Sequence, residues 1–528
     1  MRPYLLILIV LSIFLIFFHL GVRPLLSSGE ARASEIALEM MQRGNIFVPF
    51  LNEEVLLTKP PLFHWFIILF YKILGVCELA SRMPSAIAGV FTVIVVFLLG
   101  KRLWGEKLGF IAGLLLLTSP TFFWSVRCAR IDGFLLFLVT MSIYCFWRAY
   151  ENFPRGKSWF VLWFIFMALG FLAKGPIGIA APLGTGVLFL WHRGRKDVLK
   201  KIPWLWGFLI IFGIIGPWFA TIAFFVPKVN AEKFFVVQNK AWFSGEGNWY
   251  KGYVYIFHLL LGFFPWSVAI PAAIALTWKD FWKKLDEKKG FLWIWFLLVF
   301  CVFAFMGKKV SRYILPAYPA MALLLAHTIN EKNIFKTLFS WINIVVGIFV
   351  IIAARLVINV VPSFISNEFS DLLIKHIGVN IIWISALSLV VIIFGILGLR
   401  KRSFVLACCG VIVLINMFIL FIVPLEKEYY SPKPFCVMLK EKVPENLQIK
   451  AYNSWDNTIR YYYGRHVDIM RKDSELMAYL DQPEQVYCIM WRKVYDELPK
   501  DIKGKIEIIS DDYNVIDRKM ILTRSKPR

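Results

Sequence analysis

The chain has 528 residues, of which 59% are hydrophobic and only 18% are charged. This composition is far more apolar than that of an average soluble protein and indicates a membrane protein. The net charge of +24 would suit a nucleic-acid partner, but most basic clusters lie between long apolar runs, so we expect no nucleic acid to bind.

The first apolar run, residues 4–20, follows Arg2 and has no small-residue cleavage site before Arg23. We therefore interpret it as a retained membrane span. Twelve further runs bring the prediction to about thirteen transmembrane helices. They cover residues 84–100, 108–120, 133–148, 159–173, 177–191, 204–224, 254–277, 291–306, 314–329, 338–358, 380–399 and 403–424. The shorter run 62–76 predicts a surface or re-entrant helix.

A polar stretch over residues 21–62 follows the first span and carries too many charges to lie in hydrocarbon. From Ala33 to Met41 the apolar residues recur at helical spacing, and the charged residues lie off that face. The pattern predicts an amphipathic helix over residues 31–43 on the membrane surface, with Gly44 near its C-terminal end.

The charges between spans predict the orientation. The connections 101–107, 148–158, 193–201, 279–289, 331–336 and 400–402 hold far more Lys and Arg than Asp and Glu. The positive-inside rule places these six connections in the cytoplasm. We therefore expect a multi-pass protein of the cytoplasmic (inner) membrane with a cytoplasmic N-terminus and a periplasmic or extracytoplasmic C-terminus.

Residues 425–528 differ in character from the transmembrane domain, residues 1–424. Strands are expected at 447–452, 486–491, 505–510 and 515–523, and short helices at 454–463 and 474–480. The pattern predicts a small extracytoplasmic α/β domain. Cys436 and Cys488 both lie in this domain, where they either form a disulfide or stay free thiols, and the sequence leaves both alternatives open.

Ionisable residues are essentially missing from the middle of every predicted span, which argues against an ion-coupled transporter. Cations gather instead at the outer ends of the spans. They are Arg32, Lys59, Arg127, Arg130, Lys174, Lys228, Lys233, Lys240, Lys308, Lys309 and Arg312. Because Arg and Lys pair well with phosphate oxygens, the set predicts an anionic ligand at the membrane surface. Snorkelling toward lipid headgroups is the alternative for any single lysine.

Seven motifs occur in a characteristic order: GEARASEIALEM, LTKPPLFHW, LASRMPSAIAG, RCARIDGFL, LAKGPIG, FFPWS and KKVSRYILPAYPA. Over residues 1 to about 330 the chain thereby resembles the GT-C class of lipid-phosphate-sugar glycosyltransferases. The aminoarabinose transferases of lipid A and the bacterial protein O-mannosyltransferases are the most similar branches. The resemblance implies that a sugar passes from a polyprenyl (undecaprenyl) phosphate to a lipid, glycan or protein acceptor on the outer face.

The resemblance also implies roles for particular residues. Lys59 matches the family's phosphate-binding lysine, Asp132 its second acidic residue, Lys174 a later cation, and Tyr313 the tyrosine before Leu-Pro. The family's acidic pair Asp-Glu stands here as Gly29-Glu30. The other departures are Ala33 for a tyrosine, Thr58 for an acidic residue, and Trp242, after the retained Asn239, for an arginine.

Sugar transfer from a phosphate requires cations for the leaving phosphate and a base for the incoming hydroxyl or amine. We predict Asp132 and Glu30 as catalytic carboxylates. The predicted donor-binding residues are Lys59, Arg32, Arg127, Arg130, Lys174, Arg312 and Tyr313. No cluster of His and carboxylates has the spacing of metal ligands, so no cofactor is required, although a divalent cation is compatible with the site.

Three alternatives stay open. Ser27-x-x-Glu30 is also a capping box, so Glu30 can serve to close the start of a helix. Asp132 can likewise be an ordinary helix-start residue. The whole scaffold can also be a non-catalytic protein that binds or flips polyprenyl-phosphate sugars.

Overall fold

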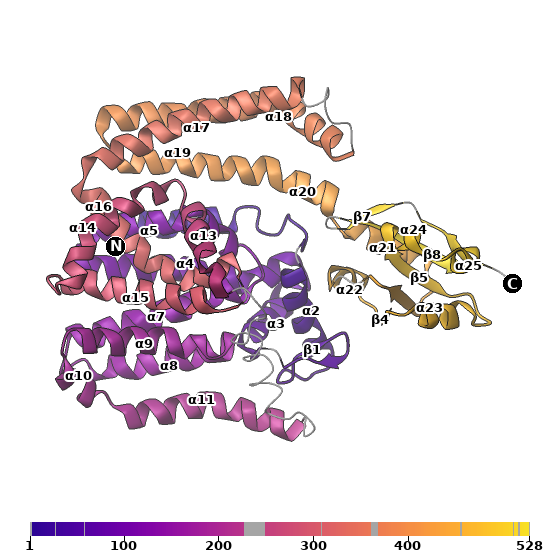
Figure 1. The fold of residues 1–528 in the computed structure, drawn as a ribbon, viewed down its shortest axis with the longest axis horizontal. Coiled ribbons are helices and arrows are strands. Elements are labelled where there is room, and N and C mark those ends of the chain that lie inside the picture. The colour runs from indigo at the N-terminus through magenta and orange to yellow at the C-terminus, as the bar shows by residue number, and fades with distance from the viewer. Residues whose placement is uncertain are drawn as a thin grey trace.

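The computed structural model describes residues 3–526 apart from 27, 58, 226–248, 308, 361–367, 455–456, 511 and 516–517. Several predicted features lie outside the described residues: Lys228, Lys233, Lys240 and Lys308, the Asn239 and Trp242 positions, and Ser27 of the capping box. The rest is a helical body with a smaller domain at one end (Figure 1).

Helices predominate among the described residues up to Glu331. They are α1 (Pro3–Phe17), α2 (Ser28–Gln42), α3 (Leu62–Leu74), α4 (Glu78–Trp104), α5 (Glu106–Leu117), α6 (Pro120–Val126), α7 (Ile131–Glu151), α8 (Lys157–Lys174), α9 (Ile177–His192), α10 (Lys196–Lys201), α11 (Trp204–Phe225), α13 (Val254–Gly262), α14 (Ile270–Trp282), α15 (Glu287–Phe305) and α16 (Tyr318–Glu331). Three 3₁₀ helices connect them: η2 (Trp249–Tyr253), η3 (Trp266–Ala269) and η4 (Ser311–Ala317).

A second group of long helices packs along one side of this body (Figure 1). It contains α17 (Asn333–Asn359), α18 (Glu368–Lys401) and α19 (Phe404–Met417). The π-helical turn η6 (Phe418–Ile422) and α20 (Val423–Tyr430) continue α19 toward the smaller domain. The predicted boundary at residue 424 therefore falls within a continuous helical path.

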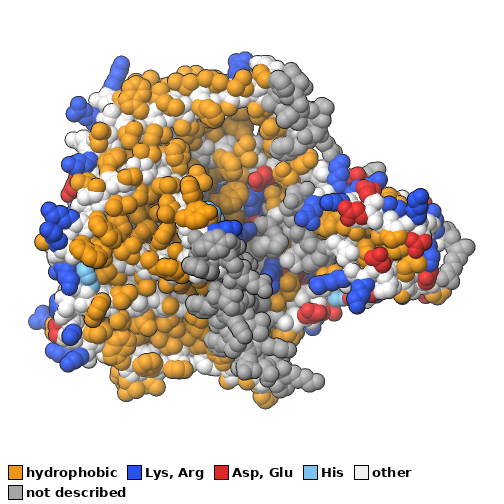
Figure 2. Space-filling view, in the orientation of Figure 1, with side chains coloured by type: hydrophobic (Ala, Val, Ile, Leu, Met, Phe, Trp, Pro, Cys, Tyr) orange, Lys and Arg blue, Asp and Glu red, His pale blue; other side chains and the backbone are white. Residues whose placement is uncertain are grey.

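Each of the thirteen predicted spans corresponds to helical structure. Eight helices in the described chain are long and apolar enough to cross a membrane, and there are up to ten if each of two bent pairs is one span. The helices α1, α3 and α9 are apolar but shorter. Lys and Arg gather at the end of the body opposite the smaller domain (Figure 2), as the positive-inside argument predicts.

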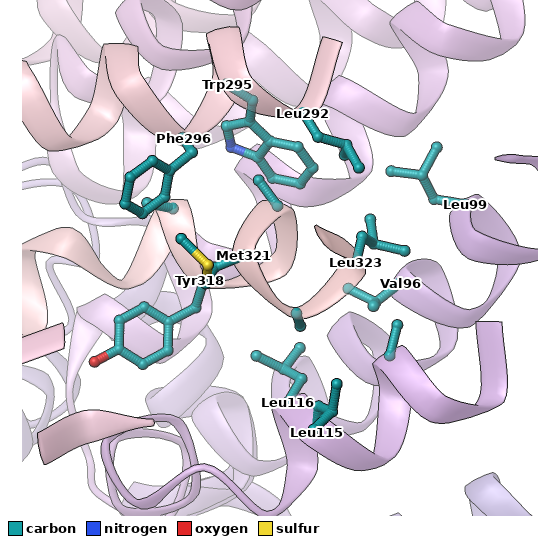
Figure 3. Packing of buried hydrophobic residues seen from close by; sticks show 14 of the residues in the cluster. Val96, Leu99, Leu115, Leu116, Leu292, Trp295, Phe296, Tyr318, Met321 and Leu323 are labelled. Carbon is teal, nitrogen blue, oxygen red and sulfur yellow. The ribbon is translucent and has the colours of Figure 1, made fainter. Parts of the chain in front are cut away.

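Large apolar side chains from α4, α5, α15 and α16 form the centre of the body (Figure 3). Trp295 is fully buried there, and its indole N–H donates to the Pro316 carbonyl over 2.8 Å, so its polar atom is satisfied. Small residues let some helices approach closely: a Cβ on Gly178 of α9 would lie 2.1 Å from the carbonyl carbon of Gly170 in α8.

The predicted amphipathic helix is α2, and it ends just before Gly44, which has φ +66°. It is followed by a two-stranded hairpin of β1 (Phe50–Leu51) and β2 (Glu54–Val55), which the sequence did not predict. The chain then enters α3, the predicted surface or re-entrant helix. The polar segment therefore forms a platform of α2, hairpin and α3.

The smaller domain is built on a mixed sheet with the strand order β4-β3-β5-β8-β6, and β7 pairs with β8. The strands are β3 (Ile449–Tyr452), β4 (Val467–Met470), β5 (Tyr487–Trp491), β6 (Ile506–Ile508), β7 (Tyr513–Val515) and β8 (Arg518–Ser525). Its helices are α21 (Lys433–Lys442), α22 (Asn457–Tyr463), α23 (Asp473–Leu480), α24 (Arg492–Glu497) and α25 (Lys500–Gly504). Both Cys436 and Cys488 are buried free thiols.

The smaller domain docks on the platform through α22. The Arg460 side chain is 7% exposed and forms ion pairs of 2.8 Å with Glu35 and 3.0 Å with Glu39, both on α2. The Tyr462 hydroxyl accepts from the Leu25 backbone N–H over 2.8 Å and donates to Glu78 over 2.9 Å. The domain is therefore held to α2 and to the start of α4 by buried polar contacts.

Candidate functional site

A cavity of about 430 Å³ lies between the platform, the N-terminal end of α7 and η4. Its charged lining residues are Arg32, Lys59, Arg130, Arg312 and Asp132, and the remaining residues include Gly29, His64 and Tyr313. Four cations thus surround one carboxylate, which makes the cavity suitable for an anion.

Asp132 lies in the first turn of α7 and is 8% exposed. Its carboxylate forms a short ion pair with Lys174, at the end of α8, and a second one of 3.0 Å with the Nε of Arg312. The Lys174 ammonium also lies 4.5 Å from the centre of the Tyr313 ring. The structure therefore brings together four of the predicted residues from three distant segments, and the two cations keep the carboxylate ionised.

Lys59 and Arg32 face the same cavity without a carboxylate partner among the residues that the structure describes. Burial lowers the pKa of Lys59 to about 8, and the neighbouring cations Lys174, Arg32 and Arg312 act in the same direction, while Asp132 opposes them. Two unpaired cations in one cavity are unfavourable unless an anion joins them. Their arrangement suits an anion such as a phosphate.

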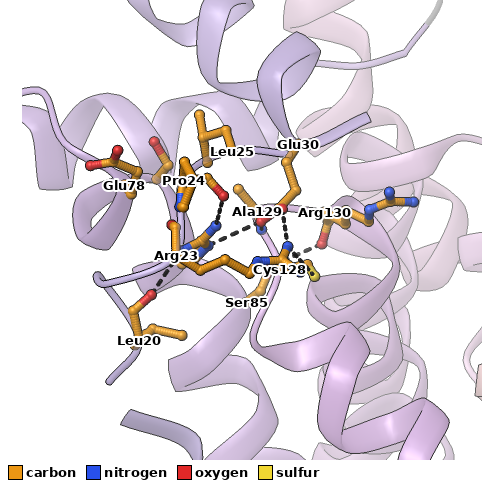
Figure 4. A network of polar contacts seen from close by, with 12 residues as sticks. Leu20, Arg23, Pro24, Leu25, Glu30, Glu78, Ser85, Cys128, Ala129 and Arg130 are labelled. Atoms are coloured by element: carbon orange, nitrogen blue, oxygen red, sulfur yellow. Dashed lines mark hydrogen bonds and ion pairs between the residues drawn. The ribbon is translucent and has the colours of Figure 1, made fainter. Parts of the chain in front are cut away.

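Glu30 does not line the cavity. It is fully buried, and its carboxylate accepts from the Nε of Arg82 over 3.0 Å and from the Ala129 N–H over 2.9 Å, and also pairs with Arg23 (Figure 4). Burial alone would raise the pKa of Glu30, but Arg82 and Arg23 outweigh it and lower the pKa to about 2. This geometry joins α2, α4 and the segment before α7, and favours a structural role over catalysis.

Gly29, next to Glu30, does face the cavity. A Cβ at this position would lie 3.3 Å from the Cζ of Arg130 and 3.5 Å from both of its terminal nitrogens. The Arg130 carbonyl is fixed by the Ser85 hydroxyl over 2.9 Å, while its guanidinium points away from the Glu30 network (Figure 4). The position at which the family carries an acidic residue is thus directed toward a cavity cation.

Two predicted cations of the outer ends lie elsewhere. Arg127 donates to the Leu15 and Ile16 carbonyls, each over 2.8 Å, and so satisfies the C-terminal end of α1. Lys309 donates to the Ala304 and Met306 carbonyls over 2.6 Å at the end of α15. Neither side chain lines the cavity, because each is already hydrogen-bonded to carbonyls at the end of a helix.

Sequence reasoning missed His64 and Arg82. His64 lines the cavity and is 3% exposed, and its Nδ1 has no hydrogen-bond partner within the described part of the chain. Arg82 is 1% exposed and, besides Glu30, binds the carbonyls of Leu20, Arg23 and Pro24. The available signal for His64 was its position five residues after Lys59, in LTKPPLFHW. The signal for Arg82 was an arginine two residues before the apolar run of α4.

The described residues contain no group of three or more His, Cys, Asp or Glu side chains that would hold a metal ion. The donors that line the cavity are mainly cationic nitrogens, which do not ligate divalent metals. A divalent cation would have to enter with its ligand.

Comparison with known proteins decides the family. A family model described as dolichyl-phosphate-mannose-protein mannosyltransferase matches residues 58–220. An uncharacterized protein of Aquifex aeolicus is 31% identical over 358 residues, which are 66% of this chain and 69% of that protein. An undecaprenyl phosphate-alpha-4-amino-4-deoxy-L-arabinose arabinosyl transferase of Proteus mirabilis is 27% identical over 369 residues, 67% of this chain and 65% of that enzyme. The chain belongs to the GT-C glycosyltransferase family.

Solved structures agree with this glycosyltransferase fold. ArnT from Cupriavidus metallidurans in the apo state aligns with a TM-score of 0.81 at 16% identity, over 99% of both chains. The same protein bound to undecaprenyl phosphate gives a TM-score of 0.79 with the same coverage. The GT-C architecture therefore extends over the whole chain, including the C-terminal domain. The family match, the named relatives and the apolar helices together identify a multi-pass inner-membrane glycosyltransferase.

Proposed function

We propose that the cavity binds the phosphate of a polyprenyl-phosphate sugar and that the protein transfers the sugar to an acceptor at the outer face of the membrane. The observation that carries this proposal is the carboxylate of Asp132 inside a cavity with four cations, two of which have no carboxylate partner among the described residues. Relatives named undecaprenyl phosphate-alpha-4-amino-4-deoxy-L-arabinose arabinosyl transferase support the donor class.

In this mechanism the acceptor hydroxyl or amine attacks C1 of the sugar from the side opposite the phosphate, so the configuration at C1 inverts. The C1–O bond breaks, and its electron pair leaves on the phosphate, where Lys59 and Arg32 stabilise the growing charge. Asp132 takes the proton of the acceptor as general base. Lys174 and Arg312 hold this carboxylate ionised and in place, while Arg130 and Tyr313 border the donor.

The same geometry argues against a protein that only binds or flips the lipid. Phosphate binding needs no carboxylate in the cavity, and an unneeded carboxylate would repel the anion. A buried Asp132 between two cations is explained when a proton has to be accepted there. Glu30 acts in this proposal as a positioning residue for α2.

The test measures transfer of radiolabelled sugar from a panel of undecaprenyl-phosphate sugars to membrane acceptors. We expect Asp132→Asn to lower the rate by about 10²–10⁴-fold while undecaprenyl-phosphate binding is retained. Lys59→Ala should weaken that binding. Asp280→Asn is the matched control, because Asp280 forms a comparable 2.7 Å pair with Lys289 on the far side of the body. A wild-type protein that binds the lipid but consumes no donor sugar would contradict the proposal.

A further inference from the structure

A second, larger cleft of about 990 Å³ lies between the β1–β2 hairpin and the C-terminal domain. Leu56, at the end of the hairpin, lines both this cleft and the cation-lined cavity, so the two spaces adjoin. The hairpin forms one wall, and β4 with the start and outer face of α23 forms the other. An acceptor that reaches Asp132 from outside the membrane has this cleft beside its path.

One wall of the cleft is a free sheet edge. Strand β4 is the terminal strand of its sheet, and it pairs only with β3 among the strands that the structure describes. Asp468, Ile469 and Met470 of β4 all line the cleft. An outer strand presents backbone N–H and C=O groups without strand partners, and these groups accept an extended peptide as an additional strand.

The charge of the cleft differs from that of the neighbouring cavity. Its lining carboxylates are Glu53, Glu54, Asp468 and Glu475, against the cations Lys450 and Arg471 and the imidazole of His466. Glu54 is exposed and has no ion-pair partner among the described side chains. A surface with this acidic excess repels phosphate-rich headgroups, attracts a basic chain and does not repel a neutral one.

The hairpin is tied to the edge of the sheet at one end of the cleft. His466, just before β4, lies 3.2 Å from Glu53 on the hairpin and 2.7 Å from Asp468 on β4. Arg460 adds a short contact to Asn52 and a 3.2 Å contact to His466. The two walls are therefore held at a fixed separation, as a groove for a chain requires.

We propose that this cleft is the acceptor site and that it binds an extended polypeptide, of neutral or basic charge, by strand addition to β4. The inference rests on the proposed function and deepens it, because it assigns the acceptor to the polypeptide class. A hydroxyl-bearing side chain of that segment then projects past Leu56 toward Asp132. Donor phosphate and acceptor chain thereby occupy adjoining sites of opposite charge.

Binding of short fluorescent Ser/Thr-rich peptides to the full-length protein in nanodiscs tests the proposal without requiring turnover. A peptide with two lysines should bind more tightly than the same peptide with two glutamates. Glu54→Lys should weaken binding of the lysine peptide about fivefold. Glu441→Lys, an equal charge change on the exposed face of α21 outside the cleft, should leave it unchanged. Methylation of every second backbone nitrogen of the peptide can be done in two alternating registers. In one of the two it should abolish binding.

Three results would overturn the inference: no peptide binding, binding that ignores Glu54→Lys, or binding that ignores backbone methylation in both registers. Displacement of the peptide by bis-phosphorylated lipid A vesicles, with the same dependence on Glu54, would assign the cleft to a lipid instead. Undecaprenyl-phosphate binding, measured on the same samples, reports on the donor cavity separately. If the wild type does not bind undecaprenyl phosphate, the proposed function is refuted, while the peptide result can still be interpreted.

Discussion

The ammonium of Lys59 shows how a single residue ties ligand binding to pH. Its folded-state pKa of about 8 lies below the ordinary 10.5, because the charge is buried among other cations. The charged form therefore predominates below pH 7 and is lost as the pH rises through about 8. We expect undecaprenyl-phosphate affinity to fall above pH 8, by up to about tenfold per pH unit, in equilibrium binding measurements.

Lys59→Arg is the matched control for this pH dependence, since a guanidinium stays charged throughout the range. Its affinity should remain level between pH 7 and about 9.5. An identical decline in the wild type and in this variant would show that another group controls binding.

Gly29 offers a test of the cavity position at which the family carries an acidic residue. It has no left-handed backbone conformation that would resist substitution, and the nearest atoms to a Cβ belong to the flexible end of Arg130. Gly29→Asp should therefore place a second carboxylate beside Arg130, raise the transfer rate about tenfold or more, and weaken lipid-phosphate affinity by repulsion. Steady-state kinetics against Gly29→Asn, which has the same shape without the charge, checks this; equal rates for the two variants would exclude a role for the carboxylate.

Local sequence predicted cavity residues that stand out by their neighbours in the chain. Asp132 beside Arg130, and Lys59 before two prolines, are such cases, and both line the cavity. The sequence did not predict the surroundings of Glu30, because Arg82 lies 52 residues away and only the fold brings it close. Arg127 was misplaced for the same reason: its partners are carbonyls of α1, 111 and 112 residues away.

At the scale of elements, α2 is held from two sides. The helix carries Arg32 into the cavity on one side, while Glu35 and Glu39 meet Arg460 of the C-terminal domain on the other. Burial raises the pKa of Glu35 to about 7, and Arg460 opposes this rise. The negative charge of Glu35 therefore depends on this one cation. The C-terminal domain thereby orients a helix of the donor site.

Arg460→Ala should undock the domain. Removing this guanidinium leaves two buried carboxylates without their cation, a change that typically costs about 3–5 kcal/mol. We expect faster proteolytic release of the C-terminal domain from the membrane-embedded protein, together with lower donor affinity.

Arg465→Ala is the control, because Arg465 pairs over 3.6 Å with Glu445, whose side chain is 95% exposed. Such a pair contributes only about 0–1 kcal/mol. Equal proteolysis rates for the two variants would show that the buried pairs do not hold the domain.

Element prediction succeeded where periodicity is long and failed where the structure is short. Every apolar run of fifteen or so residues became helix, and four strands of the C-terminal sheet lie near their expected places. Strand β4 and the hairpin were missed, because each has few residues and is fixed by its partners. Strand β4 pairs with β3. The hairpin is held by Glu39, which accepts from the backbone N–H groups of Asn52 and Glu53. These two missed elements form the walls of the acceptor cleft.

For the whole molecule, the two cavities and the C-terminal domain share one end of the helical body, and the Lys- and Arg-rich connections share the other (Figure 2). Sugar transfer at the outer face requires that the first end lie outside the cytoplasm. The positive-inside rule requires that the second lie within it. Chemistry and charge therefore lead to the same proposed orientation, with the N-terminus in the cytoplasm.

Labelling with a membrane-impermeant maleimide tests this orientation. Lys493→Cys, on the C-terminal domain where the native side chain is 86% exposed, should react in intact spheroplasts. Lys196→Cys, in the exposed first turn of α10, should react only after the membrane is opened. Both belong in a Cys77→Ser background, because the half-buried Cys77 can react with the label itself, and a serine can keep its capping contact with the Ala80 N–H. The reverse labelling pattern would place both cavities in the cytoplasm, where a donor presented at the outer face does not reach them.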